Sequence, residues 1–125
     1  MTNSILDSVK QVLGVEVDDT DFDLDIAMHI NSVFATLHQL GAGPATGYAI
    51  ENSEQEWTEF LGPSPKLNMV KSYVYIKVQM LFDPPSTSYA LDAKKAMATE
   101  YESRIQMAAE PAALFTPPER VIFDE

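Results

Sequence analysis

The sequence predicts a small all-α domain, a bundle of about four to five helices followed by an extended C-terminal arm. Apolar residues recur at helical spacing in successive segments, and glycine or proline stands between these segments. The chain has 125 residues, of which 46% are hydrophobic, so one core can form without disulfide bonds. No internal repeat or long linker divides it. We therefore expect one helical domain over residues 1–110 and an arm over residues 111–125.

Two helices are expected at the start of the chain. Ser4 precedes an apolar series that closes at Gly14, which predicts a short helix over residues 5–13. Thr20 is the expected cap of a longer helix over residues 21–40. The apolar stripe of the longer helix consists of Phe22, Ile26, Ile30, Val33, Leu37 and Leu40.

A glycine-rich loop and a very short helix are expected next. Residues 41–47 carry enough glycine and proline to predict a loop, and residues 48–50 predict a brief extended piece. Ser53 and Glu56 have the spacing of a capping box. This spacing predicts a helix of about two turns that ends at Gly62.

A third major helix is expected over residues 65–82, with Ser64 as its cap and the prolines of residues 83–85 after its end. This segment is apolar on two opposite sides. One stripe contains Leu67, Val70, Val74, Val78 and Leu81, and the other contains Met69, Tyr73, Ile76 and Met80. Such a helix is either surrounded by the other helices of its bundle or uses the second stripe as a subunit interface.

The last helix is expected over residues 89–110, with a cap among residues 86–88 and Pro111 after its end. The arm that follows carries large apolar side chains, namely Phe115, Val121, Ile122 and Phe123. Because so short a segment cannot fold alone, we expect it to dock on its own domain, on a neighbouring subunit or on a partner protein.

The charge of the chain argues against a protein that grips nucleic acid. The formal net charge is −11, and a protein that binds DNA through its phosphates needs a basic surface instead. Residues 1–62 hold eleven acidic side chains and a single basic one, Lys10, whereas residues 63–125 hold eight acidic and seven basic ones. No apolar run has the length of a signal sequence or of a membrane span, so we expect a cytoplasmic protein.

Five aspartates gather around the start of the second predicted helix, namely Asp18, Asp19, Asp21, Asp23 and Asp25. Alternating carboxylates also begin the calcium loop of an EF-hand. Counted from Asp19, however, Leu24 stands where that loop needs glycine and Ile30 where it needs glutamate. We therefore favour the simpler explanation that the helix macrodipole stabilises negative charge at this end.

No residue pattern points to catalysis, a metal or a cofactor. His29 and His38 fall on one predicted helix, about 13 Å apart along its axis, which is too far to share an ion. The chain has no cysteine. The signatures of nucleophile elbows, phosphate-binding loops and zinc proteases are missing. We therefore expect a protein that is not an enzyme.

Three segments of the chain carry a family resemblance, namely Ile26–Gly41, Trp57–Gly62 and above all Tyr73–Ser86. Through them, residues 3–110 resemble the head-to-tail connector proteins of long-tailed double-stranded DNA bacteriophages, which are also called adaptor or head-completion proteins. The shared features are packing and helix-end patterns rather than catalytic signatures.

The resemblance implies a structural protein of the virion neck that is assembled in the host cytoplasm. It implies a ring of about twelve subunits that continues the DNA channel beneath the portal protein. The next connector or a tail-terminator protein would bind its other side. In such a ring the five aspartates would repel DNA, which passes without tight binding, and the arm would reach the portal or a neighbour.

A second hypothesis is an acidic regulator that mimics DNA and binds a basic host protein. The charge of the chain would suffice for it. DNA mimicry does not explain, however, why the chain has an apolar arm and a helix with two apolar sides.

Overall fold

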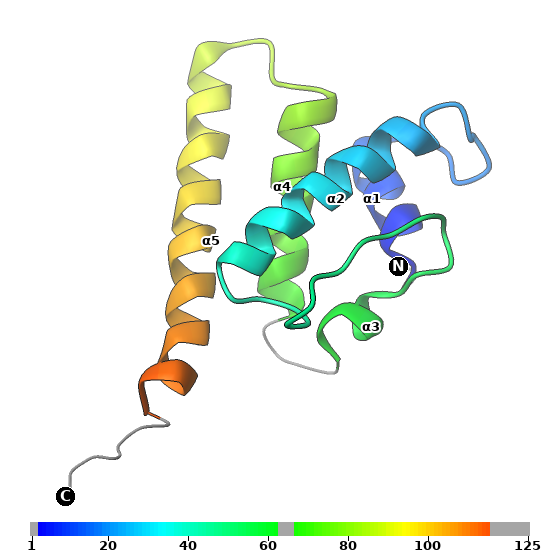
Figure 1. Cartoon of the computed structure of the whole chain (residues 1–125). Coiled ribbons are helices and arrows are strands. Elements are labelled where there is room, and N and C mark those ends of the chain that lie inside the picture. The colour runs from blue at the N-terminus through cyan, green and yellow to red at the C-terminus, as the bar shows by residue number, and fades with distance from the viewer. Residues whose placement is uncertain (1–2, 63–66, 116–125) are drawn as a thin grey trace, which may run out of the picture.

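The computed structural model describes residues 3–62 and 67–115, with side chains described from residue 3 to 62 and from 68 to 108. Five helices lie in this part of the chain: α1 (Ile5–Leu13), α2 (Asp23–Gln39), α3 (Trp57–Leu61), α4 (Leu67–Phe82) and α5 (Ser88–Phe115). It contains no strand, so the predicted all-α class is confirmed. Figure 1 shows α4 and α5 as an antiparallel pair, with α2 crossing α4 and with α1 and α3 on the side away from α5.

α4 is the central helix, because it contacts α1, α2 and α5. Its residues Val70, Tyr73, Val74 and Val78 are almost completely buried in the core. They come from both predicted stripes, whereas Leu81 of the first stripe is 49% exposed. Burial on several sides therefore accounts for the two apolar faces of this segment.

The first helix begins and ends as predicted, but the second does not begin at its predicted cap. Ser4 Oγ accepts from the Asp7 amide at 3.3 Å, and Gly14 adopts a left-handed φ of 80° at the end of α1. α2 begins only at Asp23, without a side-chain cap, and the Thr20 carbonyl oxygen accepts from the Asp23 amide in a preceding turn. The prediction that Thr20 caps this helix is therefore wrong.

The short helix α3 is capped by different residues from those predicted. Its capping box joins Glu56 and Glu59 rather than Ser53 and Glu56. The Ser53 carbonyl oxygen instead accepts from Ser4 Oγ at 2.7 Å. Residues 53–57 thus pair with the start of the chain and cannot become helical before Trp57, which makes α3 shorter than expected.

The segment at residues 48–50 belongs to no strand. The backbone groups of Ile50 bond to a side chain of α2 instead of to a neighbouring strand. The Asn31 side chain accepts from the Ile50 amide at 2.8 Å and donates to the Ile50 carbonyl oxygen at 3.0 Å. These two bonds tie the loop to α2. Ile50 is thereby buried in the core.

α5 is longer than predicted at its C-terminal end. Thr87 Oγ1 accepts from the Ala90 amide at 3.2 Å, which confirms a cap within residues 86–88. The helix continues through Pro111 to Phe115, so the prediction that Pro111 ends it is wrong. A proline removes one helical hydrogen bond and can bend a helix without terminating it. The predicted cap Ser64 lies outside the described residues, as do residues 116–125 of the predicted arm.

Candidate interaction surfaces

The acidic loop of residues 15–22 is held in place by a buried cation. The Lys10 side chain is 1% exposed, and its Nζ donates to the carbonyl oxygens of Val17 at 2.8 Å and Asp19 at 2.7 Å. The same nitrogen lies 2.7 Å from Asp23 Oδ1 at the start of α2. Two carbonyl oxygens thus accept hydrogen bonds from the ammonium group and the Asp23 carboxylate supplies the opposite charge, which compensates its burial. We call residues 15–22 the acidic loop.

The five predicted channel aspartates have different roles in the structure. Asp23 forms the ion pair with the buried lysine, and Asp19 Oδ1 accepts from the Asp21 amide at 3.1 Å. Asp23 and Asp25 lie in the first turn of α2, where the macrodipole favours them. Asp18, Asp21 and Asp25 are exposed, so these three can face a partner or a channel.

Lys10 was missed as a functional residue by sequence reasoning, although the sequence carries a signal. Lys10 stands four residues after Leu6 and three before Leu13, within the apolar stripe of the first helix. A lysine at such a position must either expose its ammonium group or find oxygen partners inside. The partners come from the acidic loop, which only the folded chain brings to Lys10.

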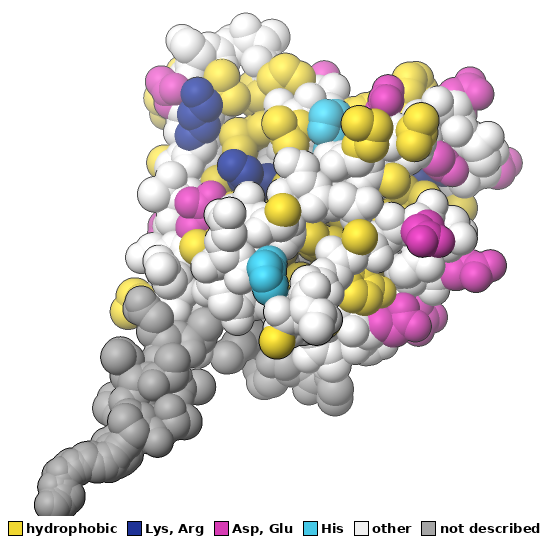
Figure 2. Space-filling view, viewed as in Figure 1, with side chains coloured by type: hydrophobic (Ala, Val, Ile, Leu, Met, Phe, Trp, Pro, Cys, Tyr) yellow, Lys and Arg dark blue, Asp and Glu magenta, His cyan; other side chains and the backbone are white. Residues whose placement is uncertain are grey.

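The burial of Lys10 leaves the described surface of residues 3–62 without a lysine or arginine charge. It is the only lysine or arginine among residues 1–62. All other described lysine and arginine side chains lie on α4 and α5. In Figure 2 the dark blue side chains gather over the α4 and α5 pair, whereas much of the magenta lies on the opposite edge, over the acidic loop and residues 51–59.

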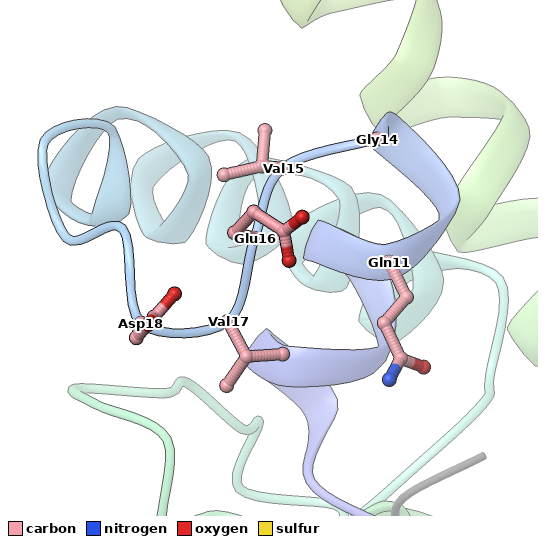
Figure 3. Close-up of a pocket in the computed structure, with 6 residues that line it drawn as sticks. All are labelled: Gln11, Gly14, Val15, Glu16, Val17 and Asp18. Carbon is pink, nitrogen blue, oxygen red and sulfur yellow. The ribbon is translucent and has the colours of Figure 1, made fainter.

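An open recess of about 440 Å³ lies under the acidic loop. Figure 3 shows Gln11 of α1 and Gly14 at its end on one side and the loop residues from Val15 to Asp18 on the other. The lining supplies two carboxylates, an amide and two valine side chains, and none of these residues is a nucleophile or a histidine. Such a lining suits polar or cationic contacts with a partner rather than covalent chemistry.

The histidines and acidic side chains form no metal centre in the described ranges 3–62 and 67–115. No group of three or more metal-ligating side chains is close enough there to hold an ion. His29 is half-buried and His38 exposed on the same helix, α2. In the same ranges, no helix combines the length and apolar character that a membrane crossing requires.

The predicted interface stripe on α4 is largely occupied within the single chain. Tyr73 is completely buried, and its hydroxyl donates to Glu102 Oε2 of α5 at 2.6 Å. Burial, and then the Glu102 carboxylate, raise the pKa of Tyr73 well above its usual range. Met69, Ile76 and Met80 are half-buried against the core and keep part of their surface exposed. Tyr73 thus joins α4 to α5, and only the other three can reach a second subunit.

A groove between α4 and α5 was not predicted, because it forms only when the two helices pack. It has a volume of about 330 Å³. Its apolar lining consists of Met80, Leu81, Pro84 and Leu91, and the lysines Lys77 and Lys95 complete it. We call these six residues the lysine groove. Met80 is the one member that also belongs to the predicted interface stripe.

The predicted docking residues of the arm cannot be placed. The side chain of Phe115 and the whole of Val121, Ile122 and Phe123 lie outside the described residues. Their predicted role therefore stays a prediction.

Comparison with known proteins gives one family. A family model described as phage connector protein matches residues 5–112 of the chain, which is most of its length. No curated protein and no solved structure matches it. The matched range contains all five helices up to Ala112 in α5, and also the acidic loop and the lysine groove.

Proposed function

The chain belongs to the phage connector protein family, and from this premise we propose that it forms a ring between portal and tail in the virion neck. In this role it works through shape, charge and assembly, without catalysis, and it continues the channel through which DNA passes. The observation that carries the proposal is the separation of charge between the two sides of the subunit.

Separated charges suit a ring because closed cyclic assemblies use two different patches on every subunit. The first 62 residues offer exposed carboxylates without an exposed lysine or arginine in their described part. The second patch would lie on α4 and α5, where the lysines are. A ring of about twelve such subunits would place the acidic side of each subunit against lysines of the next.

The acidic surface that remains uncovered in the ring has a use in the channel. Asp25 is exposed, and the carboxylates that no neighbour covers, together with the net charge of −11, would repel the phosphates of passing DNA. DNA would then slide through without tight binding.

Contacts along the neck would use apolar surface. The exposed parts of Met69, Ile76 and Met80 offer adaptable side chains for a neighbour. The arm, with Phe115 and residues 121–123, would reach the portal protein or the adjacent subunit, and the next connector or tail-terminator protein would bind the opposite side of the ring.

The first experiment is quantitative mass spectrometry of purified phage or induced prophage particles that encode the chain. A ring of the size that the family resemblance implies predicts about a dozen copies per particle. Complete absence of the chain from particles would contradict the connector role and would favour the acidic regulator that binds a basic host protein.

A truncation separates the arm from the folded domain. A chain that ends at Phe115 keeps every described helix, so we expect unchanged circular dichroism and melting together with loss of incorporation into particles. Unfolding of the truncated chain would show that the arm belongs to the core instead.

A further inference from the structure

The acidic loop has the properties of a preformed docking element. It is exposed at Val17, which is 42% accessible, and at Asp18 and Asp21. Its backbone is nevertheless fixed, because Lys10 Nζ bonds two of its carbonyl oxygens from inside the domain. A loop that is ordered before binding loses little conformational entropy when it docks.

The ends of the acidic loop add apolar surface to its charge. Phe22 is 44% exposed although its ring contacts the Phe82 ring edge to face, with the ring centroids 5.6 Å apart. Leu24 in the next turn is 74% exposed. Apolar side chains next to carboxylates require a partner site with an apolar floor and a basic rim.

The lysine groove provides such a site. Leu81 in its lining is 49% exposed, and Met80, Pro84 and Leu91 add apolar surface. Lys95 is exposed and Lys77 keeps 31% of its side chain accessible, with Glu102 at 4.0 Å as a distant ion-pair partner. Both ammonium groups can therefore approach carboxylates of an incoming chain.

A second copy of this chain is the occupant that the charges favour. Figure 1 places the loop after α1 at the edge of the molecule opposite α5, which forms one wall of the groove. One copy can thus offer its loop to a neighbour while its own groove receives the loop of another.

We propose that the acidic loop of one subunit docks in the lysine groove of the next. This contact rests on the proposed ring and identifies the surfaces that join neighbouring subunits in it. Val17 and its neighbours cover the exposed part of Leu81, while Asp18 and Asp21 approach Lys77 and Lys95.

Cysteine cross-linking in particles tests this contact, because the native chain contains no cysteine. Full-length Val17→Cys and Leu81→Cys chains are produced together in cells that assemble particles, and the particles are purified and oxidised. We expect a covalent dimer that contains one chain of each kind, and no dimer when either variant is present alone. Thr58→Cys, at an exposed position on α3, replaces Val17→Cys in the control mixture and should give no dimer.

The outcomes distinguish this contact from the proposed function. Particles that contain normal amounts of both variants but no mixed dimer would overturn the loop and groove contact while leaving the connector role intact. Particles without the chain would overturn both. A dimer of Val121→Cys with Leu81→Cys, in place of Val17→Cys with Leu81→Cys, would assign the groove to the C-terminal arm and also overturn the proposal.

Charge reversal gives a second test with an internal rescue. Lys95→Glu, and separately Asp18→Lys with Asp21→Lys, should each lower the copies per particle by about tenfold or more, because facing like charges weaken an interface by at least that much. Adding Lys77→Glu to these three changes reverses both sides of the contact and should restore incorporation. Asp18, Asp21 and Lys95 are exposed and Lys77 keeps 31% of its side chain accessible, so circular dichroism and melting should stay unchanged in the purified chains. Failure of the combined variant to recover, with its fold intact, would contradict the pairing.

Discussion

The most informative single residue is Lys10, which links folding to the shape of an outer surface. A buried ammonium group is costly, and here three oxygens, from Val17, Asp19 and Asp23, compensate it. The residue thus does not contribute to the surface charge of the chain. It holds the acidic loop in place, and its burial leaves the described surface of residues 3–62 without a lysine or arginine charge.

Replacement of Lys10 by methionine should destabilise the domain strongly. The variant leaves Asp23 and two loop carbonyl oxygens without their cation, and removal of one member of a buried ion pair costs about 3 kcal/mol or more. Urea unfolding measures this loss. Lys95→Met, at an exposed lysine, serves as the control and should change the free energy of unfolding by less than about 0.5 kcal/mol. Equal effects of the two substitutions would show that Lys10 makes no special contribution.

Two tyrosines should make the stability fall at high pH. Burial, then a hydrogen bond to Glu59, raise the pKa of Tyr48 to about 12, and Tyr73 is shifted in the same direction. Between pH 10 and 12 the unfolded chain therefore loses the Tyr48 proton before the folded chain does. The contribution of protonated Tyr48 to the free energy of unfolding is thus complete below pH 10 and is lost as the pH rises toward 12. The stability advantage of the native chain over Tyr48→Phe should shrink across this interval in urea unfolding. A constant difference would contradict the assignment.

At the scale of elements, hydrogen bonds and ring packing fix the conformation of the loop between α2 and α3. Asn31 ties Ile50 to α2, and Phe34 of α2 stacks on Phe60 of α3 with ring centroids 4.4 Å apart. Gly43 has a φ of 89° and lies against the Phe60 ring. The loop therefore positions α3 on the core through aromatic packing as well as through its backbone.

Alanine at Gly43 should be more destabilising than alanine at Gly47 in the same loop. Both glycines have a left-handed φ, which costs an alanine about 1 kcal/mol. A Cβ at Gly43 would also lie 2.5 Å from Phe60 Cε1, whereas a Cβ at Gly47 meets nothing within 4 Å. We expect the excess for Gly43→Ala to be about 1 to 3 kcal/mol, as for other overpacked sites. Thermal melting of the two variants measures the difference, and equal melting temperatures would contradict the close contact.

At the scale of the whole molecule, the lysines and arginine that the structure describes at the surface all lie on the side of α4 and α5. The exposed side chains of residues 3–62 carry carboxylates, and the described lysines outside Lys10 lie on α4 and α5. This arrangement suits head-to-tail contacts between copies, which repeat around a ring. It also predicts that the contacts weaken when salt screens the charges.

Assembly of the purified chain should therefore depend on ionic strength while its folding does not. The screening length falls from about 10 Å at 0.1 M salt to about 3 Å at 1 M, so exposed charge pairs between subunits weaken strongly. Sedimentation velocity should show a smaller share of oligomers at the higher salt concentration. The melting temperature of the single chain, whose core is apolar, should change little. A rise in oligomers with salt would show that apolar contacts dominate the interface.

The all-α class and the approximate place of every helix could be predicted from the amino-acid sequence, because both follow from local signals. Apolar spacing located the helices, and Ser4 and Gly14 marked both ends of α1 correctly. The local signals failed at Thr20, Ser53 and Pro111. At Thr20 a local turn precedes a helix without a side-chain cap, at Ser53 the chain bonds to Ser4 instead, and the helix at Pro111 simply continues.

Which candidate residues are available for function depends on contacts that form only in the folded chain. Tyr73, predicted to be part of an interface, is buried against Glu102, and Lys10, which the sequence shows only as a basic residue, is the buried partner of the acidic loop. The lysine groove arises where α4 and α5 pack together. Burial and charge pairing depend on residues far apart in the sequence, so periodicity along one helix indicates which side chains are apolar but not which surface will cover them.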